Sequence, residues 1–254
     1  MKLSPCQFET GTITEFANGS SQNPTSGAAT ISLDNTSQLD QVWSLRFAAA
    51  AAGAAVIDKT VTDPTTRINI QFLFKMSADF ALHVDNYVTL LNTYDNGNFE
   101  AIFMNLEKPS DFTLTLGGNV IPYTPTGLVL LPNVQYKIEV QIIRNATTGS
   151  IKIWLNNDDE AAPDFDTGDI NTTTGNTDYF AAGIIFTPGA LTGSFWLDNY
   201  MADIVFLGNH WLPFRFQNLT NRLYDPTDSK TIYAERLNQI KLQSEKAEGF
   251  FEAP

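Results

Sequence analysis

The sequence contains few cysteines and histidines, the residues on which disulfide-bonded secreted domains and many metalloenzymes depend. Its single cysteine, Cys6, cannot form an internal disulfide, so a disulfide-stapled module is excluded and an inert thiol is expected. The only histidines, His83 and His210, lack the spacing of zinc ligands, and we expect both to be structural. No run of 18 apolar residues occurs, so no membrane-spanning helix is predicted.

Positive charge is also scarce. The chain has 15 Lys and Arg against 28 Asp and Glu, a net charge of −13. Such a chain is a poor partner for nucleic acids or anionic membranes, and we expect it to bind neither. The first sixteen residues contain no apolar core of a secretory signal, so we expect synthesis and assembly in a cytoplasm.

Alternation of apolar and polar residues with a period of two is the dominant pattern. Ile68, Ile70 and Phe72 share one parity in the stretch 66–76, and the residues between them are polar. Stretches 136–142 and 151–155 repeat the pattern on either side of the turn NATTG, which predicts a β-hairpin. Ten further strands are predicted, at 11–16, 28–34, 44–50, 80–85, 87–94, 99–106, 112–118, 127–131, 179–186 and 194–208. So many short strands predict an all-β sandwich or barrel.

The amino-acid composition of the chain changes after residue 208. Residues 209–254 contain six basic and six acidic residues, so the whole net charge lies in residues 1–208. We expect residues 1–208 to form the sandwich and 209–254 to form an arm, with a helix or an extended segment over 229–254. The aromatic and aliphatic residues of this arm are expected to pack against another surface, and they are Trp211, Phe214, Phe216, Leu219, Leu223 and Tyr224.

Three motifs resemble the concanavalin A-like lectin/glucanase superfamily, and within it the laminin G-like jelly rolls. They are FETG at Phe8–Gly11, the hairpin YKIEV…GSIKIWLNN, and the closing strand FWLDNYMADIVF at Phe195–Phe206. Asp158 stands where many members have glycine. The resemblance covers about residues 8–208 and implies a jelly-roll sandwich of two antiparallel sheets. It leaves function open, because the superfamily includes lectins, hydrolases, lyases and virion proteins.

Enzymatic activity is not expected from the sequence. The β-glucan hydrolases of this superfamily carry E-x-D-x-x-E on one strand, which places the acid and the nucleophile on one face. No such triplet occurs here, and Glu139 stands alone between Ile138 and Val140.

An acidic loop is the candidate metal site. Calcium prefers carboxylate and carbonyl oxygens, and many laminin G-like relatives bind it at the rim of the sandwich. The alternative is a solvated loop without metal. The candidate ligands are Asp158, Asp159, Asp164, Asp166 and Asp169.

Glycan binding requires aromatic rings that stack on sugars, with amides or carboxylates beside them. Trp154 has the polar parity of its strand and is expected to face outward unless a loop or a subunit covers it. The candidate glycan-binding residues are Trp154, Asn156, Trp43, Tyr94 and Tyr179.

An acidic jelly roll without disulfides and with an apolar arm looks like the structural proteins of tailed bacteriophages, such as capsid decoration, fibre or tail proteins. The resemblance therefore predicts a non-enzymatic virion component that forms homo-oligomers and contacts other virion proteins through its arm. A lectin-like module that recognises a cell-surface glycan is the alternative, and a polysaccharide-cleaving enzyme is the third hypothesis.

Overall fold

The fold is all-β, as the alternating pattern predicted. The structure is a computed structural model, and it describes residues 2–6, 23–36, 39, 44–82, 87–95, 98–107, 111–173, 175–187 and 191–208. All of these residues belong to one unit, Met1–Gly208. The described part of the chain contains no helix long and apolar enough to span a membrane. The predicted strand 11–16 and the proposed arm 209–254 lie outside the described residues, so the division into sandwich and arm stays a prediction.

The strands follow one another with short connections. Their bounds are β1 Lys2–Cys6, β2 Asn23–Asp34, β3 Ser44–Thr65, β4 Arg67–Met76, β5 Ala81–Leu82, β6 Tyr87–Asp95, β7 Asn98–Glu107, β8 Thr113–Gly117, β9 Thr124–Val129, β10 Gln135–Ile143, β11 Ser150–Leu155, β12 Phe165–Asp166, β13 Thr177–Thr187, β14 Leu191–Thr192 and β15 Phe195–Asp203. The predicted strand 44–50 is only the start of β3, and the predicted strand 194–208 ends at Asp203 because the chain leaves the sheet there.

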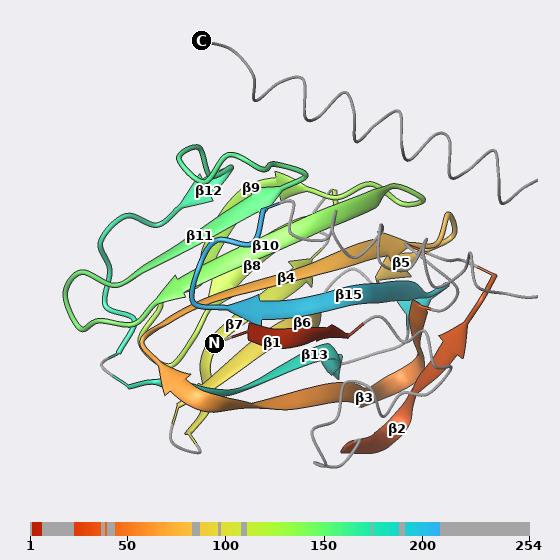
Figure 1. Cartoon of the computed structure of the whole chain (residues 1–254). Helices are drawn as coiled ribbons and strands as arrows, with labels where there is room; N and C mark the ends of the chain where they lie inside the picture. Colours follow the sequence, from red (N-terminus) through yellow and green to blue (C-terminus); the bar gives the residue numbers. More distant parts are fainter. Residues whose placement is uncertain are drawn as a thin grey trace, which may run out of the picture. The chain divides into compact units, whose positions relative to one another are not determined.

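One antiparallel sheet forms both layers of a jelly-roll sandwich. Its strand order is β12-β11-β10-β4-β15-β3-β13-β6-β7-β8-β9, with β1 added at β15 and β2 at β3. The first part of β3 pairs with β15 through Leu45–Phe47, and its later part pairs with β13 from Gly53 to Thr65. Figure 1 shows this long orange strand curving as it passes from one layer to the other. We call the layer with β4, β10, β11 and β15 the hairpin layer, and the layer with β6, β7, β8 and β13 the β6 layer.

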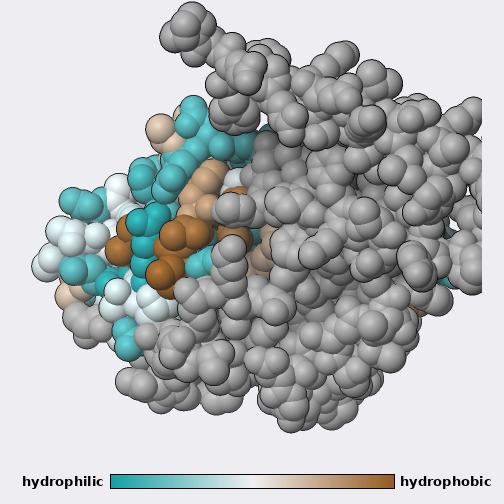
Figure 2. Space-filling view, viewed as in Figure 1, coloured by the Kyte–Doolittle hydropathy of each residue, from teal (hydrophilic) through white to brown (hydrophobic). Residues whose placement is uncertain are grey.

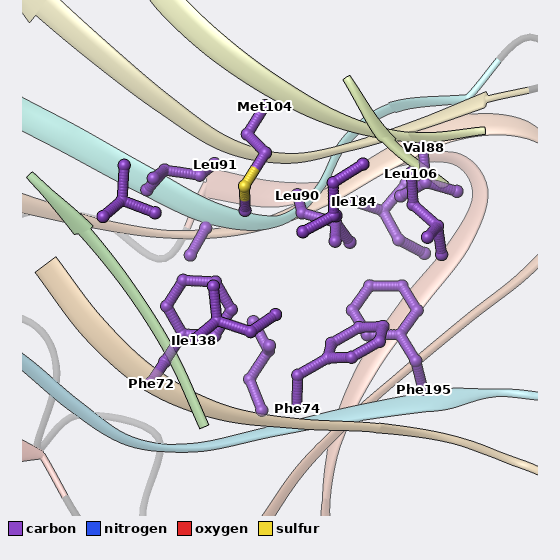
Figure 3. Packing of buried hydrophobic residues seen from close by; sticks show 14 of the residues in the cluster. Phe72, Phe74, Val88, Leu90, Leu91, Met104, Leu106, Ile138, Ile184 and Phe195 are labelled. Atoms are coloured by element: carbon purple, nitrogen blue, oxygen red, sulfur yellow. The ribbon is translucent and has the colours of Figure 1, made fainter. Parts of the chain in front are cut away.

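The hydrophobic core lies between these two layers. Phe72, Phe74, Ile138 and Phe195 of the hairpin layer face Val88, Leu90, Leu91, Met104, Leu106 and Ile184 of the β6 layer (Figure 3). The Phe195 ring stacks on Phe47 with centroids 5.1 Å apart. The apolar parity of each strand is thus the parity that meets the opposite layer, because side chains alternate between the two faces of a sheet.

The predicted hairpin forms in the expected register. Ile138 pairs with Leu155 and Ile142 with Ile151, and β10 pairs on its other side with β4. The side chain of Asn145 accepts hydrogen bonds from the backbone N–H groups of Thr147 and Thr148, which closes the turn. The local turn chemistry that the sequence predicted therefore sets the register of these strands.

Candidate functional site

The outer face of the β6 layer carries a row of polar and aromatic side chains. The register pairs Asn92 of β6 with Ala181 of β13 and with Phe103 of β7. Their neighbours Leu91 and Ala182 belong to the core, so Asn92 and Phe103 point away from it. We call this surface the β6–β8 face. It is formed by Thr89, Asn92, Tyr94, Phe103, Asn105, Glu107 and Thr115, and Tyr123 adjoins it through a hydrogen bond to Glu107.

Asn92 is the most unusual residue of this face. The residue is only 1 % exposed, yet its Oδ1 accepts no hydrogen bond from the residues that the structure describes. A buried amide atom without a partner costs free energy, so such atoms are uncommon in folded proteins. Because an amide can turn to offer either an acceptor or a donor, Asn92 is equipped to bind a polar group from a ligand.

The neighbours of Asn92 fix the floor of the face. Thr89 Oγ1 donates a 2.7 Å hydrogen bond to Asn105 Oδ1 across β6 and β7. The Phe103 ring covers Gly117 of β8, where an added Cβ would lie 2.4 Å from a ring carbon. Glycine at this position therefore allows the aromatic ring to lie close against the sheet.

A second group of side chains occupies the part of the face nearer β9. Tyr123 OH donates a 2.5 Å hydrogen bond to Glu107 Oε2, and Thr115 Oγ1 donates a 3.0 Å bond to Glu107 Oε1. The hydrogen bond to Glu107 is the largest cause that raises the pKa of Tyr123. The phenol consequently keeps its proton, and 58 % of the residue is exposed.

The structure brings together two of the five predicted glycan residues. Tyr94 of β6 and Tyr179 of β13 are directly paired across the sheet. The sequence did not predict five other residues of this face as candidates for glycan binding, and they are Asn92, Phe103, Asn105, Glu107 and Tyr123. The parity of LLNTY, which places Asn92 and Tyr94 on one face, was a signal available in the sequence, but the pairing of β6 with β7 was not.

For Trp154 the structure shows the alternative that the sequence left open, which is that other parts of the chain cover its ring. Its side chain has the predicted parity but is fully buried. The ring lies 4.8 Å from that of Phe206, between centroids, and Nε1 donates to the backbone oxygen of Asp159. Chain segments after β11 and β15 therefore cover it. Asn156 is exposed, and its Oδ1 accepts a hydrogen bond from Lys137 N, a structural contact within the hairpin.

Glu139 lies beneath the same covering segment, on the outer face of the hairpin layer. Its carboxylate accepts hydrogen bonds from Leu207 N at 2.6 Å, Gly208 N at 2.9 Å and Gln71 Nε2 at 3.0 Å. Lys137 Nζ donates to Gly208 O and pairs with Asp158. We call the stretch 204–208 the exit segment. Figure 2 shows a small brown, hydrophobic area bordered by teal on the visible part of the surface. Ile204 and Val205 of the exit segment are exposed large hydrophobic residues.

The acidic loop is occupied by contacts within the protein. Asp164 Oδ2 accepts from Leu155 N, Asp166 pairs with Lys152 at 3.1 Å, and Asp159 Oδ1 accepts from Ala161 N. Within the described residues, no three acidic, His or Cys side chains gather in a way that could hold a metal ion. Asp158 and Asp169 are exposed in the same loop, and calcium binding stays an untested prediction.

The remaining candidates cannot be placed. Trp43 and the arm residues Trp211, Phe214, Phe216, Leu219, Leu223 and Tyr224 lie outside the described residues. Their predicted roles, and the predicted oligomer, virion partners and location, are therefore untested.

Comparison with known proteins identifies the fold through solved structures. No family model matches the chain, and no curated protein matches its sequence. An endo-β-1,4-glucuronan lyase from the fungus Trichoderma reesei matches with a TM-score of 0.58 and 13 % identity, over 75 % of this chain and 93 % of that one. The cellulose-induced protein Cip1 matches with a TM-score of 0.56 and 13 % identity, over 79 % of this chain and 97 % of that one. A mutant of the alginate lyase Aly36B in complex with an alginate trisaccharide matches with a TM-score of 0.51 and 13 % identity, over 80 % of this chain and 95 % of that one.

These matches support the jelly-roll fold and contradict two expectations. The predicted non-enzymatic role in a virion is wrong, because the similar structures include polysaccharide lyases and offer no link to phage particles. The expectation was wrong because the hydrolase motif E-x-D-x-x-E belongs to only one class of enzymes with this fold. Its absence therefore excluded one mechanism and left other enzymes open.

Proposed function

We propose that this chain processes a polysaccharide on the β6–β8 face. The observation that carries the proposal is the buried amide of Asn92, whose Oδ1 has no partner in the described part of the chain, set among hydroxyls, a second amide and the Phe103 ring. Aromatic faces pack on sugar rings, and amides and hydroxyls bind sugar hydroxyls. The names of the fold neighbours, two of them lyases of acidic polysaccharides, support the same class of substrate. We also propose membership in the concanavalin A-like superfamily.

The chemistry that this face fits best is β-elimination at a uronate. In that reaction a base removes the proton from the carbon next to the carboxylate, the bond to the 4-oxygen of the ring breaks, and an acid protonates the departing oxygen. The intermediate carries extra charge on the carboxylate, which hydrogen-bond donors stabilise. Asn92, with its amide turned so that Nδ2 takes the place of the unpaired Oδ1, would supply such a donor. Tyr94, two residues along β6 on the same face, would take the proton from the carbon as its phenolate and would then, as the phenol formed in that step, donate it to the departing oxygen.

The test is product formation from a panel of polysaccharides. The purified chain is incubated with glucuronan, alginate, a neutral β-glucan and a polymer of alternating uronate and neutral sugars. The ultraviolet absorbance of the new double bond reports elimination, and new reducing ends report any cleavage. We expect product from at least one uronate polymer, and Tyr94→Phe should lower the rate on the order of 100-fold.

Matched variants separate this role from a structural one. Asn92→Ala should lower the rate with only a small loss of stability, since the Oδ1 that it removes is unpaired among the described residues. Tyr136→Phe, which removes a hydroxyl that accepts from Leu131 N in the hairpin layer, should keep the activity. No product from any polymer, or full activity in Tyr94→Phe and Asn92→Ala, would refute the proposed function.

A further inference from the structure

Tyr123, Glu107 and Thr115 form a preorganised group that the proposed reaction does not use. The phenol and the threonine hydroxyl each donate to a different oxygen of the Glu107 carboxylate, at 2.5 Å and 3.0 Å. A carboxylate offers about four lone-pair positions, so acceptor capacity remains for further donors. The ring of Tyr123 is held by its own hydroxyl while most of the residue stays exposed. A ring fixed in this way loses little side-chain entropy when a ligand stacks on it.

The position of this group favours an oligomeric ligand. Phe103, Asn105 and Glu107 occupy alternate positions of β7 and so share the β6–β8 face. At about 3.3 Å per residue, Glu107 lies about 13 Å along the strand from Phe103, which pairs with Asn92. That distance exceeds one sugar ring. A polysaccharide that reaches Asn92 with one unit can therefore reach Glu107 with another.

The charge of the group determines which sugar unit it accepts. A carboxylate accepts hydrogen bonds from sugar hydroxyls but repels the carboxylate of a uronate. The raised pKa of Tyr123 keeps the phenol neutral, so the group has a single negative charge, on Glu107. The charge arrangement at Asn92 is different, because a neutral amide can donate to a uronate carboxylate.

We propose that Tyr123, Glu107 and Thr115 form a subsite for an uncharged sugar unit, so that the substrate is a polysaccharide containing both uronate and neutral sugars. This inference rests on the proposed function, which supplies the uronate position at Asn92 and Tyr94. Glu107 and Tyr123 are specificity-determining residues here, and neither takes part in proton transfer.

The test compares two kinds of oligosaccharide of equal length as substrates. One is built only of uronates, and the other alternates uronate with a neutral sugar. The wild-type chain should have a kcat/KM at least about 10-fold higher for the alternating substrate, which corresponds to about 1.4 kcal/mol. Glu107→Gln, which removes the charge and keeps an acceptor, should reduce this ratio by raising kcat/KM for the uronate substrate.

Further variants identify the stacking role. Tyr123→Ala should raise KM for the alternating substrate about 10-fold with little change in kcat, since it removes binding and no chemistry. Val120→Ala, at an exposed residue shortly before Tyr123, is the matched control and should change neither constant. Thermal unfolding of each variant checks that the fold is kept.

The outcomes distinguish this inference from the proposed function. If the chain cleaves uronate polymers but the ratio is near one, or is unchanged in Glu107→Gln and Tyr123→Ala, the subsite is refuted and the function stands. If no uronate substrate of either kind is cleaved, both are refuted.

Discussion

Replacing Glu139 by glutamine tests whether one buried carboxylate holds the exit segment on the hairpin layer. The two oxygens of Glu139 receive three N–H donors, from Leu207, Gly208 and Gln71, and the side chain is fully buried. Glutamine has the same shape, but one of its two polar atoms is an NH2 group. In Glu139→Gln at least one of the three donors must therefore lose its acceptor.

The size of the effect follows from these contacts. A buried donor left without an acceptor costs about 1–3 kcal/mol. Loss of the charge offsets part of this cost, because burial disfavours an ionised carboxylate. We therefore expect the free energy of unfolding of Glu139→Gln to fall by about 1–2 kcal/mol at neutral pH. Hydrogen exchange at the amides of Leu207 and Gly208 should become faster in the variant, since these amides lose protection directly.

The pH dependence of this difference has a definite sign. Burial raises the pKa of Glu139 above its ordinary 4.5, while the donors from Leu207, Gly208 and Gln71 and the charge of Lys137 lower it in part. Between pH 4.5 and the raised pKa of Glu139, the folded chain therefore keeps a proton that the unfolded chain has released. The free energy of unfolding consequently falls as pH rises through that window, and glutamine, which does not titrate, lacks this contribution. The advantage of the wild type over Glu139→Gln should be largest at low pH and shrink towards neutral pH.

Urea unfolding at several pH values and amide exchange provide the measurements. Glu160→Gln is the matched control, because it removes an exposed carboxylate that pairs with Arg67, and solvent screening limits its effect to about 0.5 kcal/mol. An unchanged urea midpoint in Glu139→Gln, or unchanged exchange at Leu207 and Gly208, would show that Glu139 does not hold the exit segment.

Three further predictions concern packing and metal binding. Gly183→Ala should lower the free energy of unfolding by about 2–4 kcal/mol in urea, because φ is +116° and the new Cβ would lie 2.4 Å from the Phe47 ring. Gly127→Ala, with φ +74° and open space, should cost only about 1–2 kcal/mol, and equal costs would contradict the packing argument. Trp154→Ala should destabilise by about 3–5 kcal/mol yet leave polysaccharide cleavage per folded molecule unchanged, which activity normalised to the folded fraction will check. A chelator should leave the Tm unchanged, because Asp159 and its neighbours in the loop bind protein groups, whereas a higher Tm with added calcium would restore the metal hypothesis.

The sequence determined the layers of this protein but not what covers them. Alternation in 66–76 and 136–142 predicted strands whose apolar parity forms the core, and β4 and β10 confirm it. That inference works because a strand places every second side chain on the same face, whatever its partners are. The same rule correctly predicted that Trp154 lies on the outer face of its strand. It could not show that Phe206, about fifty residues later, packs on that face.

The residues that come together on the β6–β8 face could likewise be identified only from the tertiary structure. Asn92, Phe103 and Glu107 belong to no motif that would single them out in the sequence. Their association requires β6, β7 and β8 to pair in one register, and register is set by long-range contacts and bulges rather than by local pattern. Local alternation therefore fixed which side of each strand is buried. Only the packed sheet decided which polar side chains meet, and hence where a sugar chain could bind.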